Sequence, residues 1–473
     1  MSDKLKDECG VFGISLSKES PDAIRKLYLG LFALQHRGQE SCGIAYKKNG
    51  SIEVYKTAGL VSGKFFETAP FNESISIGIG HVRYSTSGGS GIFNAQPLTF
   101  KFNKGEIAIA HNGNIPNYCA IKNELIQNGA IFQTTSDSEI LVHIMSRIVG
   151  SDFERSLQSA LDQLQGAYSI LMMRGDELIA FRDPNGFRPL IYAEVENGYV
   201  FASETNALDL IGAVNYTEVE PGQIVYCSSG KIRKVKFANS GKITQCAFEL
   251  IYFSRPDSII FGESVHEVRT KMGECLAKAA KIKPDIVIPV PDSGNSAALG
   301  FSRYSGIPFE FGLIRNHYTG RSFIKPEQKD RIESVKIKLN PIKSVIQGKT
   351  VAVIDDSLVR GTTSSKISKM LRDAGAKEVH FFLSSPEIKG GCYFGIDTPT
   401  DKELISFENS PDEVAKIINA DSVTFLPIEY LKSCFKEPDK YCYACFDGNY
   451  PYKPDDKEQT NRIVRACGKK EDI

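Results

Sequence analysis

The chain has 473 residues, of which 41% are apolar, and its 57 basic and 57 acidic side chains cancel to a formal net charge of zero. This length predicts two or three domains with sizeable cores, and the charge balance gives no indication of binding to nucleic acid or to anionic membranes. The segment Met1–Glu8 is charged, and no run of about eighteen apolar residues occurs, so we expect a cytoplasmic protein without a membrane span. The eleven cysteines are an odd number, which favours metal binding or a nucleophile over a disulfide framework.

An apolar strand is predicted to begin at Cys9 and to run to Ile14. A helix follows, with Ser20 as its N-cap, Pro21 in its first position and an end near residues 35–38. Its apolar stripe consists of Ile24, Leu27, Tyr28, Leu31 and Phe32. A lone cysteine at the start of a strand is usually a small buried hydrophobic residue, so Cys9 needs further support before it is given a chemical role.

Four separated polar motifs provide that support. They are Gln35-His36-Arg37-Gly38-Gln39-Glu40, His81-Val82-Arg83-Tyr84-Ser85-Thr86, His111-Asn112-Gly113-Asn114-Ile115 and Ser136-Asp137-Ser138-Glu139. Taken singly, Arg83 could be a surface ion-pair partner, and Asn112-Gly113 could be a hairpin turn. As an ordered set they resemble the class II glutamine amidotransferase domain, an N-terminal-nucleophile hydrolase, over residues 9–230.

The resemblance implies a role for each of these residues. Met1–Glu8 would be a propeptide whose removal makes Cys9 the chain terminus and the nucleophile. The freed α-amine, which titrates near ~8, would be the general base. Asn112 and the Gly113 N–H would form the oxyanion hole. Arg83 would pair with the α-carboxylate of glutamine, and Asp137 with its α-ammonium group.

The polar segment Lys231–Lys242 is a candidate domain boundary, and residues from about 246 to 430 alternate between predicted strands and helices. The first strand of this region covers Asp285–Val290, and the loop Pro291–Ser296 follows it. A helix over Ala297–Tyr304 then ends at Gly306. The loop could be simply a tight connection between strand and helix.

The segment Val351–Thr363 is the most informative part of the chain. An apolar strand ends in Asp355 and Asp356, a loop of small residues follows, and a helix then shows an apolar stripe that stops at Gly375. Ligands bind at the carboxyl ends of parallel strands, where small residues let backbone N–H groups approach a phosphate. The two acids suit ribose hydroxyls or Mg²⁺, although acids at a strand end can also be merely solvated. No Gly-Lys-Ser/Thr sequence follows, so ATP hydrolysis is not favoured.

The same segment resembles the phosphoribosyl-pyrophosphate signature of type I phosphoribosyltransferases. This resemblance implies that Asp355 and Asp356 hold the ribose diol and the metal, and that Ser293 joins them around Mg²⁺. The residues implied for the 5′-phosphate are Ser357, Val359, Arg360, Gly361, Thr362 and Thr363. Residues 325–343 carry six basic and three acidic side chains, and this segment, including Lys325, is predicted to close over the site as a lid.

The pair Cys442-Tyr443-Ala444-Cys445 has a chelating spacing, which by itself leaves zinc, a redox pair and coincidence open. The arrangement resembles the iron–sulfur subclass of glutamine phosphoribosylpyrophosphate amidotransferases. In that subclass the four ligands of a 4Fe–4S cluster would be Cys246, Cys392, Cys442 and Cys445. Cys434 is the main rival ligand.

The whole chain resembles this amidotransferase family. The resemblance implies an αββα N-terminal-nucleophile hydrolase domain over residues 9–230, a type I phosphoribosyltransferase α/β domain with a parallel sheet over residues 246–430, and a tail over residues 431–473. Ammonia released from glutamine would displace pyrophosphate from phosphoribosyl pyrophosphate and give 5-phosphoribosylamine, in the first step of purine synthesis. Each subunit would hold one Mg²⁺ and one 4Fe–4S cluster, in a homo-oligomer (a dimer or tetramer) inhibited by purine nucleotides.

Two alternatives remain open at this point. One is another class II glutamine amidotransferase, such as a sugar-phosphate aminating enzyme, and the other is a non-catalytic regulator that senses phosphoribosyl pyrophosphate. The Asp355-Asp356 segment argues against the first, and the motifs around Cys9 argue against the second.

Overall fold

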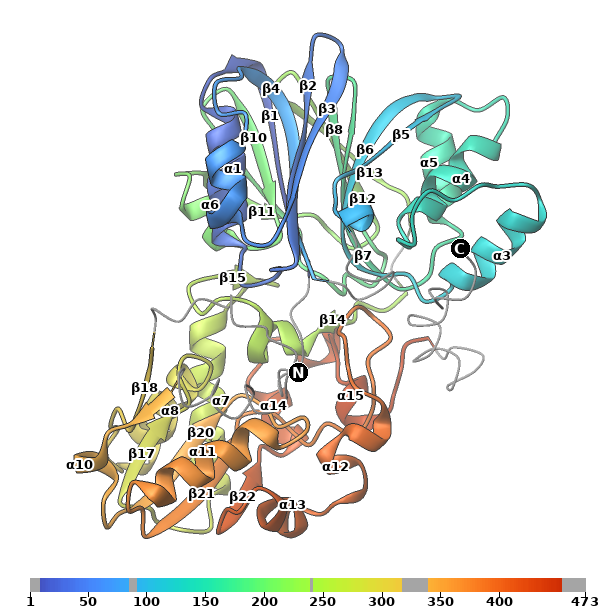
Figure 1. The fold of residues 1–473 in the computed structure, drawn as a ribbon. Coiled ribbons are helices and arrows are strands. Elements are labelled where there is room, and N and C mark those ends of the chain that lie inside the picture. Colours follow the sequence, from blue (N-terminus) through green and yellow to red (C-terminus); the bar gives the residue numbers. More distant parts are fainter. Residues whose placement is uncertain (1–8, 85–91, 239–240, 317–338, 453–473) are drawn as a thin grey trace.

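Residues 9–84, 92–238, 241–316 and 339–452 are described by a computed structural model, and the elements named below lie within these ranges. Figure 1 shows two halves stacked one above the other, the first built on two large sheets and the second on one. Ser85, Thr86 and the predicted lid residue Lys325 lie outside the described residues.

Two antiparallel sheets form the amino-terminal half. Their strand orders are β11-β9-β10-β1-β4-β2-β3 and β13-β12-β8-β7-β6-β5. Their inner faces pack together through one apolar cluster that includes Ile79, Leu171 and Val225. The strands are β1 (Gly10–Ser20), β2 (Ser41–Lys48), β3 (Ser51–Ala58), β4 (Ile75–Arg83), β5 (Leu98–Phe102), β6 (Gly105–Asn114), β7 (Ala167–Arg174), β8 (Glu177–Arg182), β9 (Ile191–Val195), β10 (Gly198–Ala202), β11 (Val214–Glu218), β12 (Gln223–Ser228) and β13 (Lys231–Lys236).

Helices cover the two outer faces, so the half has four layers (Figure 1). On the first sheet lie α1 (Ala23–Ala33) and α6 (Thr205–Asp209), and on the second lie α3 (Tyr118–Gln127), α4 (Glu139–Arg147) and α5 (Phe153–Leu161). Ile24, Leu27 and Leu31 of α1 are fully buried, and burying a side chain of this kind stabilises a fold by roughly 1.5–3 kcal/mol. Shorter turns are η1 (Val61–Phe65), α2 (Phe66–Thr68) and η2 (Ile92–Asn94). The predicted αββα architecture is present.

The predicted start of the first helix is wrong by two residues. Ser20 is the last residue of β1, and α1 begins at Ala23 after Asp22. The hydroxyl of Ser20 accepts a hydrogen bond from the N–H of Asp22 at 3.3 Å, so it stabilises the turn before the helix. Strand pairing of Ser20 with Ile75 outweighs its local preference for an N-cap position. Three residues of the predicted stripe are buried as expected, whereas Tyr28 is partly buried against Phe65 and Phe32 is 45% exposed.

The sheet continues past the predicted limit of the amino-terminal domain. Lys231–Lys236 forms β13, which pairs antiparallel with β12 and is the edge strand of the second sheet. Its alternation of Lys and Arg with Ile232 and Val235 explains why it reads as a polar segment, since charged residues are common on an edge strand. The connection between the halves therefore lies after Lys236 in the described structure.

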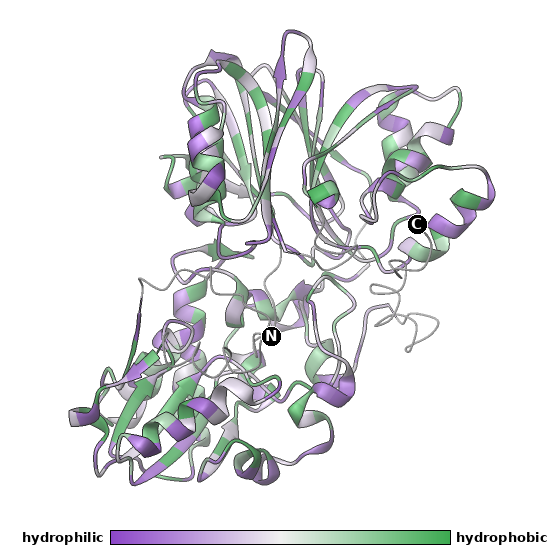
Figure 2. Ribbon diagram, viewed as in Figure 1, coloured by the Kyte–Doolittle hydropathy of each residue, from purple (hydrophilic) through white to green (hydrophobic). Residues whose placement is uncertain are grey.

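A parallel four-stranded sheet, ordered β17-β20-β21-β22, forms the centre of the carboxyl-terminal half. The strands are β17 (Ile286–Pro289), β20 (Thr350–Asp355), β21 (Glu378–Leu383) and β22 (Ser422–Phe425). Alternate residues face opposite layers: Val351 and Val353 contact the cluster that includes α11 (Thr362–Asp373) and α13 (Pro411–Ile417), while Ala352 and Ile354 contact the cluster that includes α7 (Val265–Ala279) and α8 (Asn295–Ser305). Burial on both faces explains why these strands are continuous apolar runs, and Figure 2 shows this apolar colouring along the sheet.

The helices predicted beside this sheet are confirmed. Helix α8 ends at Gly306, which adopts a left-handed conformation, and α11 buries Ile367 and Leu371 as its stripe predicted. The remaining elements are β14 (Gln245–Cys246), η3 (Glu249–Phe253), β15 (Ile259–Ile260), β16 (Glu263–Ser264), β18 (Leu313–Arg315), β19 (Leu339–Pro341), α10 (Lys343–Ile346), η4 (Asp401–Glu403), α12 (Ile405–Glu408), α14 (Ile428–Ser433), η5 (Pro438–Lys440), β23 (Tyr441–Cys442) and α15 (Ala444–Asp447). In the described part of the chain, no helix has the length and apolar character needed to cross a membrane.

One apolar core runs through both halves. It includes Leu27 and Leu31 of α1, Phe248 and Ile251 in the connection, and Met272 of α7. Residues far apart in the sequence thus share a continuous core, which fixes the two halves against each other.

Candidate active sites

Cys9 lies at the start of β1, a strand between β10 and β4, and it is 8% exposed. Its Sγ donates a hydrogen bond to the carbonyl oxygen of Tyr84 at 3.3 Å. Its own carbonyl oxygen accepts one from Nε of Arg37 at 3.2 Å. Because Gly10 pairs with Val82, these contacts place the thiol where β1 begins beside the end of β4.

Burial raises the pKa of the Cys9 thiol to about 11, with Asp137 and Glu40 acting in the same direction and Arg83 in the opposite one. The charges of Arg83 and Asp137 therefore influence the pKa of the Cys9 thiol. Such an influence is expected if the three residues belong to one site. At neutral pH the thiol is protonated, and it needs a nearby base to become a nucleophile.

Asp137 lies just before α4 and is 4% exposed. Burial opposes ionisation, but His111 and several hydrogen bonds outweigh it and hold the pKa of the Asp137 carboxyl below its usual range. One oxygen accepts from the N–H of Ile115 at 3.0 Å, and the other lies 3.4 Å from Nδ1 of His111. The result is a fixed negative charge, which suits an ammonium group of a substrate.

Asn112 and Gly113 are residues of β6, not of a hairpin turn. The Asn112 side chain is fully buried, yet neither its nitrogen nor its oxygen has a hydrogen-bond partner among the described residues. Gly113 has a φ of +146°, and a Cβ there would lie 2.0 Å from the carbonyl oxygen of Ala167. A buried amide without a partner is uncommon and is typical of a site that awaits a ligand.

The second site lies at the carboxyl end of β20. Asp355 and Asp356 are buried there, and Oγ of Ser293 donates to Oδ1 of Asp355 at 2.8 Å. Ser293 follows β17, which is the parallel neighbour of β20, so the sheet brings together two loops that lie far apart in the sequence. Ser357 donates to Oδ2 of Asp356 at 2.6 Å. The predicted metal-binding residues thus lie together.

The loop after Asp356 leads directly into helix α11. Gly361 precedes the helix with a φ of +81°, and a Cβ there would lie 2.6 Å from Cδ1 of Ile405. The helix N-terminus at Thr362 and Thr363 has no side-chain cap, so its first N–H groups suit an anion. Nη2 of Arg360 lies 3.4 Å from Oε1 of Glu403. The backbone of this loop is therefore better suited to a phosphate than the Arg360 side chain.

The donor set of this second site fits Mg²⁺. In the described residues no group of three or more His, Cys, Asp or Glu side chains is arranged to hold a metal ion. Mg²⁺, however, is commonly bound by one or two carboxylates together with substrate phosphates and water. Asp355 and Asp356 supply two carboxylates, so the missing ligands would come with the substrate.

The four predicted cluster cysteines are near enough to interact electrostatically, although in the part of the chain that the structure describes they do not form a group arranged to hold a metal ion. Cys246 and Cys442 are directly paired between β14 and β23. Burial raises the pKa of the Cys445 thiol, and the charges of Cys442, Cys392 and Cys246 raise it further. Cys434, the rival ligand, contacts another thiol instead: its Sγ lies 3.9 Å from that of Cys275.

Comparison with known proteins identifies the family. A glutamine amidotransferase domain family matches residues 85–210. The chain is 48% identical to amidophosphoribosyltransferase 3 of Arabidopsis thaliana, over 97% of this chain and 86% of that protein. The chain belongs to the amidophosphoribosyltransferase family. It is also 43% identical to the amidophosphoribosyltransferase of Bacillus subtilis, over 94% of each chain, and 41% identical to that of Methanothermobacter thermautotrophicus, over 98% of this chain and 99% of that one.

Two solved structures agree with this assignment. One is described as the allosteric regulatory enzyme of purine biosynthesis, with a TM-score of 0.89, 42% identity and coverage of 96% of this chain and 99% of that one. The other is the Bacillus subtilis glutamine phosphoribosylpyrophosphate amidotransferase complexed with ADP and GMP, with a TM-score of 0.88, 41% identity and coverage of 96% and 100%. The predicted fold class and the predicted amidophosphoribosyltransferase function, at the first step of purine synthesis, are confirmed. The two alternative functions are not supported.

No pattern in the sequence indicated how the two halves of the chain are joined. Arg37, fully buried, donates from Nη1 to Glu204 at 2.5 Å and from Nη2 to Glu249 at 2.6 Å. Arg188 lies 3.4 Å from the same Glu249 and donates to the carbonyl oxygen of Phe394 at 2.6 Å. Arg37 belongs to the polar motif at residues 35–40, but its partners lie more than 160 positions away, so no local pattern could identify them.

Proposed function

We propose that this chain hydrolyses glutamine at Cys9 and transfers the ammonia to phosphoribosyl pyrophosphate, giving 5-phosphoribosylamine and pyrophosphate. One combination of observations supports the proposal: the chain has a buried thiol, Cys9, close to the charges of Arg83 and Asp137, and separately a buried carboxylate pair that leads into a phosphate-type loop. The first arrangement suits the release of ammonia from an amide, and the second suits a phosphorylated sugar acceptor.

Glutamine would bind with its α-carboxylate at Arg83 and its α-ammonium at Asp137. The thiol of Cys9, with a pKa of about 11, would lose its proton to the terminal α-amine, which becomes available once Met1–Glu8 is removed. The sulfur would attack the side-chain carbonyl, and Asn112 with the Gly113 N–H would stabilise the oxyanion. Ammonia would leave after taking up a proton, and water would then hydrolyse the glutamyl thioester to glutamate and free Cys9.

At the second site the sugar phosphate would be oriented by this chain's own groups. Ser357, Val359, Arg360, Gly361, Thr362 and Thr363 would surround the 5′-phosphate, and Asp355 and Asp356 would face the ribose hydroxyls. Ammonia would attack C1 of the ribose, and the C1–O bond to pyrophosphate would break. One Mg²⁺ per subunit, held by Asp355, Asp356 and Ser293, would supply neutralisation of the leaving pyrophosphate's charge.

We propose one 4Fe–4S cluster per subunit, on Cys246, Cys392, Cys442 and Cys445. Burial raises the pKa of Cys442 to about 12, and neighbouring thiols oppose ionisation of Cys445. Such a group of thiols is easily deprotonated only when a cation is bound among them. Ligation by thiolates alone suits an iron–sulfur cluster and zinc about equally, and the resemblance to the iron–sulfur subclass favours the cluster.

Two further features of the enzyme are proposed by analogy with its relatives. Since a relative is complexed with ADP and GMP, purine nucleotides would be the feedback inhibitors. We also propose a homo-oligomer, either a dimer or a tetramer.

The glutamine site is tested by Cys9→Ser. We expect synthesis of 5-phosphoribosylamine to be lost with glutamine and retained with ammonia, and amino-terminal sequencing of the native protein to begin at Cys9. Cys42→Ser is the matched control, because burial also raises the pKa of Cys42 to about 11. Full use of glutamine by a chain that retains Met1–Glu8 would contradict the proposal.

A further inference from the structure

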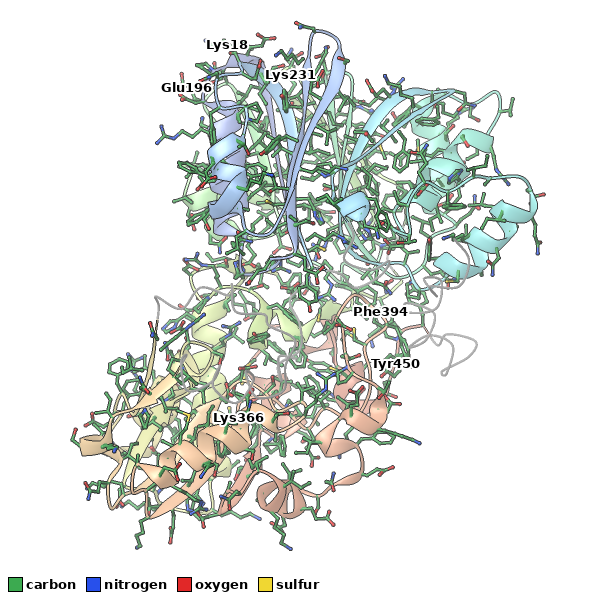
Figure 3. The ribbon with its side chains drawn as sticks, viewed as in Figure 1. Lys18, Glu196, Lys231, Lys366, Phe394 and Tyr450 are labelled. Atoms are coloured by element: carbon green, nitrogen blue, oxygen red, sulfur yellow. The ribbon has the colours of Figure 1, made fainter. Side chains whose placement is uncertain are left out.

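The segment 391–396 of the carboxyl-terminal half lies against the proposed glutamine site. The carbonyl oxygen of Tyr393 accepts a hydrogen bond from Nδ2 of Asn114 at 2.9 Å, between residues 279 positions apart. Nη2 and Nε of Arg188 donate to the carbonyl oxygen of Phe394 at 2.6 and 3.2 Å. The Phe394 ring stacks on Phe187 at 4.3 Å. Figure 3 shows Phe394 at the level where the two halves meet.

Gly395 of this segment packs closely on Arg188 and on Gly113; a Cβ on Gly395 would lie 3.1 Å from Nη2 of Arg188. Gly395 has a φ of +106°, and a Cβ there would lie 3.2 Å from the carbonyl carbon of Gly113 and 3.3 Å from its Cα. On its other side Gly113 leaves no room either, because a Cβ on it would lie 2.0 Å from the carbonyl oxygen of Ala167. The Gly113 backbone is thus enclosed between β7 and segment 391–396.

We propose that segment 391–396 is a positioning element for glutamine hydrolysis: Gly395, by its close packing on Gly113, holds the oxyanion-hole N–H in place. The inference rests on the proposed role of Gly113. It assigns to the phosphoribosyltransferase half a part of the glutamine site, so that the amidotransferase half alone does not complete that site.

The physical reason is preorganisation. A donor that stabilises an oxyanion is effective when it already points at the position where charge develops, and small displacements of catalytic groups are costly. A peptide group between two rigid neighbours cannot turn away from that position. The hydrogen bond from Asn114 to Tyr393 also holds Asn114, the residue after Gly113, against segment 391–396.

The carboxyl-terminal region holds the segment from its far side. The hydroxyl of Tyr450 donates to the carbonyl oxygen of Gly391 at 2.6 Å, and its ring packs on Tyr393 at 4.7 Å. Sγ of Cys392, a proposed cluster ligand, accepts from the N–H of Phe394 at 3.2 Å. Segment 391–396 therefore contacts both Gly113 and the region of the proposed cluster cysteines, so a change in that region can reach Gly113 through this segment.

Gly395→Ala tests the inference in the full-length holoenzyme. The added methyl group would press on Gly113 and on Nη2 of Arg188, and we expect kcat for glutamine hydrolysis to fall about tenfold or more, with KM for glutamine changed less than about twofold. Ammonia-dependent synthesis should keep the wild-type rate. The control is Gly105→Ala, since Gly105 has a φ of +111° and open space where its Cβ would be. The Gly105→Ala control introduces a similar backbone strain, but its methyl group meets no neighbouring atom.

A second variant covers the case in which Gly395→Ala does not fold. Asn114→Ala deletes the bond to Tyr393 without adding bulk, and it too should lower kcat for glutamine and spare ammonia-dependent synthesis. An unchanged kcat in these variants, or a parallel loss of ammonia-dependent synthesis, would overturn the positioning role. Asn112→Ala separates the two levels of the proposal. If it also hydrolyses glutamine at the full rate, the oxyanion hole itself is misassigned, whereas a loss there with full activity of Gly395→Ala refutes the positioning role alone.

Discussion

Burial determines the chemistry of individual residues in the proposed glutamine site. Burial raises the pKa of Cys9 to about 11, while at Asp137 it is outweighed by His111, which keeps that carboxyl ionised. The two groups are close enough to influence each other, yet one is held neutral and the other charged. These opposite charge states suit the proposed roles. Cys9 is a nucleophile that needs a base, and Asp137 is an anion that binds a cationic group.

Asp355→Asn should separate the two half-reactions. Oδ1 of Asp355 accepts hydrogen bonds from Ser293 and from the N–H of Asp356, and an asparagine can keep both bonds, so the variant should fold. Loss of the charge should lower 5-phosphoribosylamine synthesis about a hundredfold or more with either nitrogen source, since a ligand charge for Mg²⁺ is removed. Glutamine hydrolysis should persist. Pyrophosphate release with ammonia is the measurement.

The control is Asp373→Asn, at the opposite end of helix α11, where the carboxylate forms an exposed pair with Lys369. It should leave synthesis unchanged. Wild-type synthesis by Asp355→Asn at low Mg²⁺ concentration would rule out its role in metal binding.

At the scale of elements, a buried ionic network joins the turn after α1 to η3 in the connection between the halves. Arg37 bridges Glu204 and Glu249, and Glu204 also accepts from the N–H of Arg255 at 2.9 Å. These side chains are fully buried. Removing one partner from such a network is costly because the remaining charge stays buried without compensation.

The network predicts a pH dependence of stability that Glu204→Gln should reduce. Burial opposes ionisation of Glu204, but His36 and Arg37 outweigh it and hold its pKa well below the usual value. Its contribution to stability is therefore complete above the unfolded value of about 4.3 and is lost as the pH falls below it. The variant should be less stable by about 3 kcal/mol at pH 7 and should lose less stability on acidification.

Urea unfolding at several pH values measures this effect. Glu73→Gln is the control, because Glu73 pairs with Lys48 at the surface, where both side chains are at least 30% exposed. Such a pair contributes about 1 kcal/mol or less. An unchanged pH slope in Glu204→Gln would contradict the role given to this network.

At the scale of the whole molecule, the cysteine region connects the carboxyl-terminal tail to both halves. Strand β14, which follows the first half, pairs in parallel with β23 of the tail. Cys246 and Cys442 are neighbours in the register of this pair. Cys392 adjoins the segment that packs on Gly113. A cluster bound at this place would hold three distant parts of the chain together.

Cys445→Ser should therefore lose iron and sulfide and lower the thermal stability of the anaerobically purified protein, because metal binding at such a site contributes directly to folding. Cys434→Ser is the control, since Cys434 contacts Cys275 and Tyr430 rather than the proposed ligands. It should retain the full iron content. Normal iron content in Cys445→Ser, or its loss in Cys434→Ser, would exclude the proposed ligand set.

Local sequence patterns were sufficient to predict several elements of this chain. The Asp355-Asp356 loop, helix α11 with its buried Ile367 and Leu371, and helix α8 with its stop at Gly306 are found as predicted, because an apolar period, a loop of small residues and a glycine stop act over short distances. Local preference failed at Ser20, where strand pairing prevailed, and at Lys231–Lys236, where a polar edge strand resembles a linker.

The contacts between these elements could be found only in the folded chain. Arg37 with Glu204 and Glu249, Ser293 with Asp355, and Gly395 with Gly113 are contacts between residues that lie from about 60 to about 280 positions apart. Sequence motifs identified the reacting groups because each group lies in a short contiguous pattern. The way in which other residues pack around those groups depends on burial, on strand register and on the close approach of distant backbone segments. These arise only when the chain is folded.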